Sequence, residues 1–121
     1  MSGYKDLEIY NEAFRLALEV HKASLLLPQY ELYEQGGQVR RSSKSVKDQI
    51  AEGYGRRKYK ADYIKFLTYS QASCDETLNQ LEMIRILHRD LYNWESLIDE
   101  YETLGKKINK YIQYVEKNWR S

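Results

Sequence analysis

Basic side chains are concentrated in one part of the chain. Between residues 40 and 65, nine lysines and arginines stand against three acidic residues, so this stretch has a net charge of +6. The rest of the chain has a net charge of −5, because the whole sequence holds 19 basic and 18 acidic residues. Cations gathered on one surface attract phosphate groups, which is the chemistry of nucleic-acid binding. This stretch is therefore the first candidate site.

Eight of these cations form the candidate phosphate-binding set. On a helix that turns by about 100° per residue, Arg40, Lys44 and Lys47 share one stripe, roughly 100° from the predicted apolar stripe. Arg41 lies further round, on the outer surface. The following loop and the start of the next helix add four more cations: Arg56, Arg57, Lys58 and Lys60. We expect this set to supply the positive charge of the site.

Tyrosines alternate with the cations of the second group. Tyr54, Tyr59 and Tyr63 lie there, and tyrosine rings stack on unpaired bases. A different interpretation is a solvated basic face that pairs with an acidic protein partner or with a neighbouring protomer. The sequence pI of about 7.8 is below the range usual for nucleic-acid-binding domains. On the residues alone, both interpretations stay open.

A metal site is not indicated. A dinuclear metal site in a helical bundle needs a glutamate three residues before a histidine on the inward faces of two helices. Leu18 stands at that position before His21, and Arg85 stands there before His88. We therefore predict no metal site, and we expect both histidines to pack at the core edge or to face water.

Nucleophilic and phosphate-loop chemistry are not indicated either. Cys74 falls in a predicted apolar seam, whereas a reactive thiol needs an exposed, electropositive setting. One cysteine also excludes an intrachain disulfide and a cysteine-based zinc or iron–sulfur site. Gly53-Tyr54-Gly55 follows a helix rather than a strand, so it does not match a dinucleotide-binding loop. We predict a protein that is not an enzyme and has no cofactor.

The elements that position these residues follow from the spacing of apolar side chains. A first helix is predicted with Asp6 as its N-cap, and it ends near Leu27 because Pro28 cannot continue it. Its predicted core face consists of Leu7, Tyr10, Phe14, Ala17, Leu18, His21 and Leu25.

A second helix is predicted from Leu32 to Ala51. Gly36-Gly37 argues against an early start, since a glycine costs a helix about 1 kcal/mol relative to alanine. Its predicted core stripe consists of Val39, Ser43, Val46, Ile50 and Gly53. Gly53 is expected at the C-cap. Glu52 precedes it, and an acid near a helix C-terminus is unfavourable. We therefore predict that Glu52 and Gly53 are structural residues and that Glu52 pairs with an arginine or another donor.

Two longer helices complete the chain. A helix is predicted over residues 62–87. Its heptad-like seam continues to the next residue and has a centre of small side chains: Tyr63, Leu67, Ser70, Cys74, Thr77, Leu81, Ile84 and His88. Asn93 then caps a helix with this apolar stripe: Leu97, Tyr101, Leu104, Ile108, Tyr111, Ile112, Val115 and Trp119. No segment shows the alternation of a strand. These patterns predict an all-α, antiparallel up-down-up-down four-helix bundle, with residues 1–121 as a single domain.

Composition also bears on location and assembly. No apolar run approaches the ~18 residues of a membrane span. The segment Met1–Asp6 lacks the apolar core of a signal peptide, so a cytoplasmic protein is predicted. Several of the 12 tyrosines, such as Tyr69 and Tyr114, lie off the predicted core faces. Tyrosine suits half-buried positions and subunit interfaces, so we expect a homo-oligomer.

Several stretches of this sequence resemble a known family. They are Tyr4–Tyr10, Gln38–Ser43 and, above all, Ile50–Arg56, which holds the element Ile-Ala-Glu-Gly. Phe66-Leu67 and the segment Ser73–Leu81 continue the match. Over nearly its whole length the chain is similar to bacterial four-helix-bundle proteins that are encoded in 23S rRNA intervening sequences, sometimes labelled S23 ribosomal proteins.

The resemblance implies a short four-helix bundle that assembles into a ring-shaped homopentamer. The family also includes the accessory variability protein of diversity-generating retroelements, which binds nucleic acid through basic surfaces and works with a reverse transcriptase. Arg40, Arg41 and Arg56 occupy positions that are basic in the family pattern. Lys44 and Lys47 depart from it, because relatives commonly have an apolar residue and a proline there.

These observations lead to one predicted function and one alternative. We predict a non-enzymatic, oligomeric helical bundle that binds structured RNA or DNA through its basic surface, with a reverse transcriptase as a partner in a retroelement context. The alternative is a protein-interaction or scaffold subunit whose basic face docks an acidic protein or a neighbouring protomer.

Overall fold

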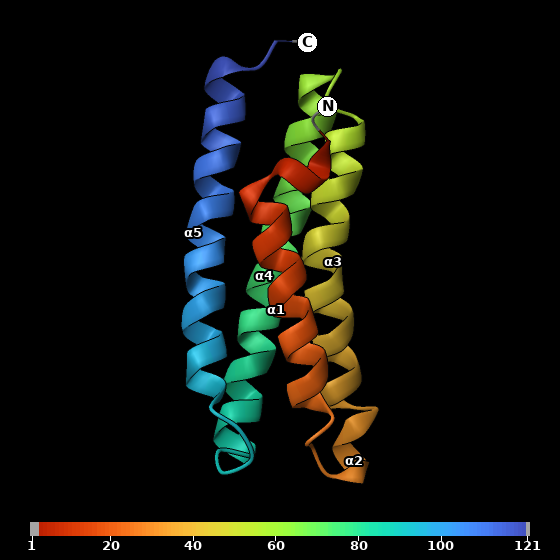
Figure 1. Ribbon diagram of the computed structural model, residues 1–121, viewed down its shortest axis with the longest axis vertical. Coiled ribbons are helices and arrows are strands. Elements are labelled where there is room, and N and C mark those ends of the chain that lie inside the picture. Colours follow the sequence, from red (N-terminus) through yellow and green to blue (C-terminus); the bar gives the residue numbers. More distant parts are fainter. Residues whose placement is uncertain (1–2, 121) are drawn as a thin grey trace.

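The computed structural model describes residues 3–120, which form helices joined by short turns. In chain order the elements are η1 (Tyr4–Asp6), α1 (Glu8–Ser24), α2 (Gln29–Leu32), α3 (Gln35–Gly55), α4 (Lys60–Leu87) and α5 (Trp94–Asn118). The four long helices lie side by side, and α2 is a single turn at one end of the bundle (Figure 1). Within the described range there is no β-strand, so the predicted all-α bundle of four helices is confirmed.

Successive long helices run in opposite directions. In Figure 1, α1 descends towards α2, α3 returns, α4 descends again and α5 returns. α3 packs against α1 on one side and α4 on the other, while α5 packs mainly against α4. The α3–α4 turn therefore lies at one end of the molecule, and α2 and the α4–α5 loop lie at the other (Figure 1).

The predicted core stripes of α3, α4 and α5 are buried over most of their length. The fully buried aliphatic side chains of these helices include Val39, Val46, Ile50, Leu67, Leu81, Ile84, Leu97, Leu104 and Ile108. The small centre of the α4 seam lets both neighbours approach closely. Ser70 Oγ donates to the carbonyl oxygen of Val46 in α3 at 2.7 Å, and Cys74 Sγ donates to that of Tyr101 in α5 at 3.4 Å.

The predicted core face of α1 is wrong for four of its seven residues, whereas Leu7 and Tyr10 are half-buried against the core and Ala17 is buried. Phe14, Leu18 and Leu25 are 42%, 51% and 57% exposed, and His21 is exposed as well. The buried face consists instead of Ile9, Ala13, Leu16, Ala17, Val20 and Ala23, of which only Ala17 was predicted. Both sets recur at helical spacing, so periodicity alone does not choose between them. The small alanines let neighbouring helices approach, and α1 is left with a second apolar stripe that faces outward.

Three predicted helix ends also differ from the structure, and a fourth is confirmed. The first helix was predicted to end near Leu27, but α1 ends at Ser24 and residues 25–27 form a turn. Leu7, not Asp6, is the N-cap of α1, because the Asp6 carboxylate accepts a hydrogen bond from the Gly3 amide at 3.1 Å within η1. The second helix was predicted to start at Leu32, but α3 starts at Gln35, because Leu32 ends α2 and residues 33–34 form a turn. At the start of α5, Asn93 is the N-cap as predicted, since its side chain accepts a hydrogen bond from the Ser96 amide at 3.3 Å.

Gly53 lies inside α3 rather than at its C-cap. α3 continues to Gly55, and none of the described glycines has a positive φ. A Cβ atom at Gly53 would lie 3.0 Å from the Cβ of Phe66 in α4. The glycine is therefore explained by the close approach of α3 to α4.

Candidate nucleic-acid interface

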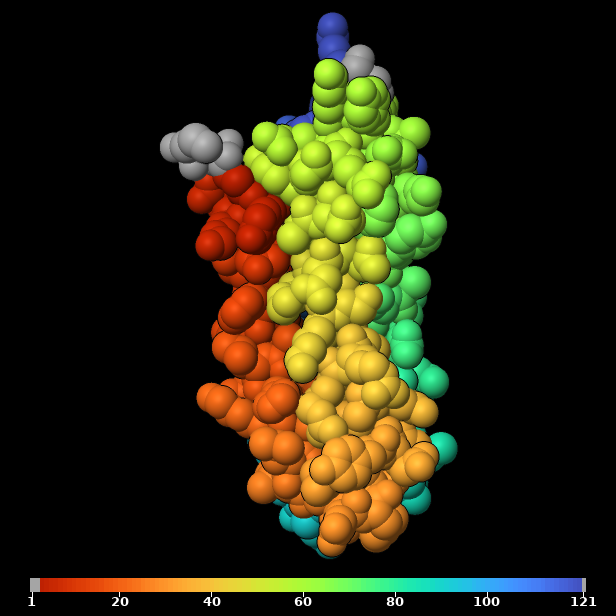
Figure 2. All heavy atoms as spheres, turned by 90° about the vertical axis from the view of Figure 1, so that its right-hand side faces the viewer, coloured from red at the N-terminus to blue at the C-terminus, as the bar shows by residue number. Residues whose placement is uncertain are grey.

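The outer face of α3 holds the first group of predicted cations. Figure 2 shows this side of the molecule, with α3 along the middle, α1 on one side and α4 on the other. Arg41 and Lys44 are exposed here, and neither has a hydrogen-bond or ion-pair partner within residues 3–120. Their charges are therefore free to meet a ligand.

Arg40 is occupied inside the protein. Its Nη1 donates to Ser24 Oγ at 2.8 Å, and its Nη2 donates to the carbonyl oxygen of Leu32 at 2.6 Å. The Leu32 carbonyl ends α2 and has no partner in its own helix, which is a usual target for an arginine fork. Arg40 therefore ties α3 to the ends of α1 and α2, unlike the surface cation that the helical stripe predicted.

Lys47 is also partly withdrawn from solvent. Its side chain is 22% exposed, its ammonium lies 5.6 Å from the ring centroid of Phe14 in α1, and it pairs with Asp48. The aliphatic part of the side chain covers apolar surface while the charge stays near water. Lys47 thus contributes less positive potential to the outer face than Arg41 or Lys44.

Two cations of the α3–α4 turn have structural partners. Arg57 Nη1 donates to the carbonyl oxygen of Tyr54 at 2.8 Å, and its guanidinium carbon lies 4.0 Å from the Tyr54 ring centroid. Lys60 Nζ donates to the carbonyl oxygen of Glu116 in α5 at 2.6 Å. The Trp119 indole N–H donates to the Arg57 carbonyl oxygen at 2.8 Å. These contacts hold the turn against the C-terminal end of α5.

Arg56 and Lys58 point outward from the same turn. Arg56 Nε donates to Glu52 Oε2 at 3.1 Å, which is the arginine partner that the sequence predicts for Glu52. Both side chains are about half exposed, so this ion pair is weak and easily exchanged for a phosphate. The Lys58 ammonium lies 5.7 Å from the ring centroid of Tyr59.

Only one of the three predicted stacking tyrosines is open to a ligand. Tyr63 is fully buried, its hydroxyl shares a 2.8 Å hydrogen bond with that of Tyr111, and burial raises the pKa of Tyr63. Tyr54 is half-buried beneath Arg57. The sequence prediction is therefore wrong for these two rings, because both sit on the inner side of the turn, whereas Tyr59 remains exposed.

The structure adds aromatic residues that the sequence analysis did not assign to the site. Phe66 and Tyr69 lie on α4, with ring centroids 5.5 Å apart. Lys65 Nζ lies 5.8 Å from the Phe66 centroid, and the Arg56 guanidinium carbon lies 4.8 Å from it. The spacing of three residues from Phe66 to Tyr69 is the signal that places these two rings on one helix face.

The eight predicted cations do not form one continuous patch. One group lies on the middle of α3, and the other lies at the α3–α4 turn. From Lys47 to Arg56 the rise along the helix is roughly 13 Å. Asp48 and Glu52 are exposed on α3 between the two groups. A nucleic-acid strand that contacts both groups has to pass these two carboxylates.

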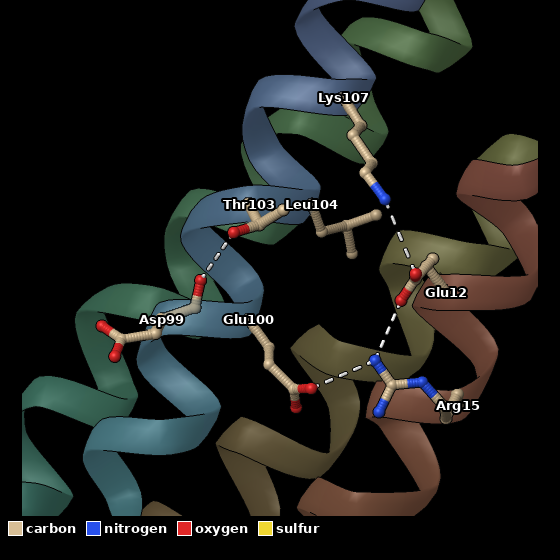
Figure 3. A pocket seen from close by; sticks show the side chains of 7 residues that line it. All are labelled: Glu12, Arg15, Asp99, Glu100, Thr103, Leu104 and Lys107. Atoms are coloured by element: carbon tan, nitrogen blue, oxygen red, sulfur yellow. Dashed lines mark hydrogen bonds and ion pairs between the residues drawn. The ribbon is translucent and has the colours of Figure 1, made fainter.

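A separate cleft of about 200 Å³ lies between α1 and α5 (Figure 3). Arg15 Nη2 lies 2.9 Å from Glu12 Oε2 and 3.3 Å from Glu100 Oε1, and Lys107 Nζ lies 3.6 Å from Glu12 Oε1. The hydrogen bond from Arg15 holds the pKa of Glu12 below its ordinary value. Because both glutamates face a cation, the cleft is an ion-pair network that links the two helices.

Other reactive groups are buried or scattered. Cys74 is fully buried, and burial raises the pKa of its thiol to about 12. His88 Nε2 lies 2.9 Å from Glu31 Oε2, a contact that holds α2 against the end of α4. Across residues 3–120, no group of three histidine, cysteine, aspartate or glutamate side chains is placed to hold a metal ion.

None of the described helices has a stretch long and apolar enough to span a membrane. The fold and this surface define a four-helix-bundle protein with exposed cations along one helix and around one interhelical turn. The sequence model of the 23S rRNA-intervening sequence proteins matches residues 5–110, and the chain belongs to that family. The family membership inferred from the Ile-Ala-Glu-Gly element is thus confirmed. A search of curated proteins finds no match.

A solved structure has the same fold. It is the crystal structure of a protein of unknown function from the S23 ribosomal protein family of Bacteroides thetaiotaomicron. The two structures superpose with a TM-score of 0.77 over 86% of this chain and 97% of the other, and 19% of the aligned residues are identical. At this identity the likeness supports the fold alone.

Proposed function

We propose that this protein binds structured RNA or DNA without catalysing a reaction, mainly through contacts with phosphates. The observation that supports it best is the pair Arg41 and Lys44, two exposed cations on α3 without an internal partner among residues 3–120. Cations of this kind neutralise phosphates and release counterions, which drives binding with little dependence on base sequence.

The eight predicted cations divide into two roles in this proposal. The residues assigned to phosphate contact are Arg41, Lys44, Arg56 and Lys58. The other four make contacts within the protein that hold helix ends in place or pack on α1, and they are not assigned to phosphate contact: Arg40, Lys47, Arg57 and Lys60.

Self-association is the second part of the proposal, with a ring-shaped homopentamer as the expected assembly. The outward apolar stripe of α1, which includes Phe14, Leu18 and Leu25, supports it. A helix with apolar residues on two faces has one face more than a lone bundle can bury. A symmetric oligomer would also repeat the basic surface, so that several weak contacts act together on one long nucleic acid.

The position of the gene in the genome would indicate which nucleic acid and which partner the protein meets. We place the protein in the cytoplasm. If its gene stands beside a reverse transcriptase, as in a diversity-generating retroelement, that enzyme is the expected partner. If the gene lies inside a 23S rRNA gene, the transcript of that gene is the first nucleic acid to test.

The test is a binding titration with long RNA and DNA at two salt concentrations. Replacing both Arg41 and Lys44 with alanine should weaken binding and make the slope of log affinity against log salt shallower by roughly 1.5, at 0.7 to 0.9 per phosphate contact. The matched control replaces Lys106 and Lys117, two exposed lysines of α5, with alanine. It removes the same charge and should leave the slope unchanged.

The second candidate is a scaffold subunit that docks an acidic protein. The large exposed apolar side chains at the α2 end favour a protein partner, among them Leu26, Tyr30, Tyr33, Ile86, Leu87 and Leu91. If the wild-type protein shows no salt-sensitive binding to any long RNA or DNA, the nucleic-acid proposal is wrong, and the scaffold function is the one to test next.

A further inference from the structure

We propose that the α3–α4 end of the protein binds an unpaired strand of RNA or DNA, whose bases stack on Tyr59 and Tyr69. The proposal rests on the nucleic-acid function proposed above, and it assigns the form of nucleic acid that this end of the bundle selects.

Two exposed rings and one supporting ring form the stacking surface. Tyr59 is 59% exposed and Tyr69 is 45% exposed, so both present much of their surface to solvent. The half-buried Phe66 ring packs edge-to-face on Tyr69 at 81°, which restricts the movement of Tyr69. A ring that is held in place loses less conformational entropy when a base stacks on it.

Phe66 and Tyr69 lie together on α4, and Tyr59 lies just before the first residue of this helix. Tyr59 caps this helix, and its carbonyl oxygen accepts the first helical hydrogen bond from the Tyr63 amide at 3.0 Å. From Tyr59 to Tyr69 the rise is roughly 15 Å, which corresponds to about four nucleotides at 3.4 Å each in a stacked strand. The surface is therefore long enough for a short unpaired segment.

Cations lie beside two of the three rings. Arg56 and Lys65 lie 4.8 Å and 5.8 Å from the Phe66 centroid, and Lys58 lies 5.7 Å from that of Tyr59. A base stacked on Tyr59 would thus lie near Lys58, and a base stacked on Tyr69 would lie next to Phe66 and the two cations at that ring. Residues 52–69 hold five basic and two acidic residues, a net charge of +3, and one of the two acids, Glu52, is paired with Arg56.

An unpaired strand fits this surface better than a duplex. In a duplex the faces of the bases are covered by their neighbours, so aromatic rings on a helix surface find no base to stack on. Unpaired bases expose both faces, and proteins bind them on aromatic side chains beside basic residues. A duplex would use the cations of this end and leave the tyrosines without a role.

The experiment compares a short single-stranded oligonucleotide with a blunt duplex of the same length, each as RNA and as DNA, by fluorescence anisotropy. The variants are Tyr59→Leu with Tyr69→Leu, and Tyr59→Phe with Tyr69→Phe, which keeps the rings. Tyr114→Leu is the matched control, because Tyr114 is similarly exposed but lies on α5 beside the N-terminal end of α1. Helical circular dichroism checks the fold.

The wild-type protein should bind the single strand more tightly than the duplex. Losing a stacked ring should weaken single-strand binding about tenfold for each tyrosine, so the leucine variant should lose roughly a hundredfold. The phenylalanine variant and Tyr114→Leu should bind the single strand as the wild type does, and duplex binding should be the same in all four proteins.

Two results would overturn the inference, and they differ in what they leave standing. If the leucine variant binds the single strand as tightly as the wild type, while replacing Arg41 and Lys44 weakens binding, the stacking site is wrong and the phosphate-binding function stands. If the wild type binds neither the strands nor the duplexes, both proposals are wrong.

Discussion

Arg40 and Arg41 are adjacent in the sequence but have different surroundings in the folded protein. Arg40 donates to Ser24 and to the Leu32 carbonyl, whereas Arg41 has no partner within residues 3–120. One residue along a helix turns a side chain by about 100°, which here separates a buried polar contact from open solvent. Arg40 therefore has a structural role, whereas Arg41 is available to bind a ligand.

Replacing each arginine by alanine should show this difference. We expect Arg40→Ala to lower the free energy of unfolding by about 1–3 kcal/mol, because hydrogen bonds from a charged group are lost and the Leu32 carbonyl is left without a partner. Arg41→Ala should change it by less than about 0.5 kcal/mol. Urea unfolding at one protein concentration measures both. Equal effects of the two changes would contradict the assigned roles.

Gly53 and Gly55 offer a second test at the residue scale. Alanine favours a helix over glycine by about 1 kcal/mol, but a Cβ at Gly53 meets the Phe66 Cβ, which is fixed to the α4 backbone and cannot rotate away. Overpacking costs about 1–3 kcal/mol, so Gly53→Ala should lower the free energy of unfolding by about 1 kcal/mol.

Gly55→Ala is the control for that change, because a Cβ at Gly55 has no neighbouring atom within 4 Å. It should leave stability within a few tenths of a kcal/mol of the wild type, or raise it slightly. Thermal unfolding followed by circular dichroism compares the two. A Gly53→Ala protein that is more stable than the wild type would show that α3 and α4 are not tightly apposed there.

At the scale of elements, α1 and α5 are joined by the ion pairs of their shared cleft, and this contact depends on pH. The Arg15 hydrogen bond lowers the pKa of Glu12 in the folded protein below the ordinary value of 4.5. As pH falls, the Glu12 carboxylate therefore takes up its proton at a higher pH in the unfolded chain than in the folded protein. The stabilisation is therefore complete above the unfolded pKa and is lost as pH falls through the folded one.

Glu12→Gln should thus lower stability at neutral pH, by less than about 1 kcal/mol because the pair is partly exposed. The difference from the wild type should vanish in acid, once Glu12 is protonated in both states. Glu102→Gln, an exposed glutamate of α5, is the control and should have no effect at either pH. Urea unfolding at both pH values provides the measurement. If Glu12→Gln lowers stability by the same amount at acidic pH, the assigned direction of the Glu12 pKa shift is wrong.

At the scale of the whole molecule, the outward stripe of α1 should control assembly. Leu18 lies in the middle of that stripe and contributes nothing to the core of its own bundle. Leu18→Glu should therefore dissociate the proposed oligomer while circular dichroism stays helical, because burying a carboxylate at an interface without a partner is costly. Lys106→Glu, an exposed site on α5 on the side that faces α4, serves as the matched control. Light scattering reports the mass, and a wild-type mass near 14.5 kDa at micromolar concentration would rule out self-association.

Much of the bundle could be predicted from the spacing of apolar residues. α3 and α5 each have one apolar face, so their buried sides follow from the helical period. The buried side of α4 follows instead from its heptad-like seam. α1 has two such faces, and the prediction chose the one with larger side chains. The structure buries the one with Ala13 and Ala23, because close packing with neighbouring helices favours small residues at those positions.

The candidate site could be predicted in composition but not in detail. Charge counting places the cations on α3 and the α3–α4 turn correctly, since net charge is a property of the sequence. It does not tell which of them are occupied by partners. Ser24 lies 16 residues from Arg40, and the carbonyl of Glu116 lies 56 residues from Lys60.

The amino-acid sequence was therefore sufficient for the family, the helical class and the location of the positive charge, because these depend on local period and composition. Tertiary structure decided which α1 stripe is buried, which arginines remain free and which aromatic rings stand beside them. Each of these depends on atoms that are far apart along the chain and are brought together only when the four helices pack. Local patterns contain no information on such distances, so the exposed set of Arg41, Lys44, Tyr59 and Tyr69 emerges only in the folded bundle.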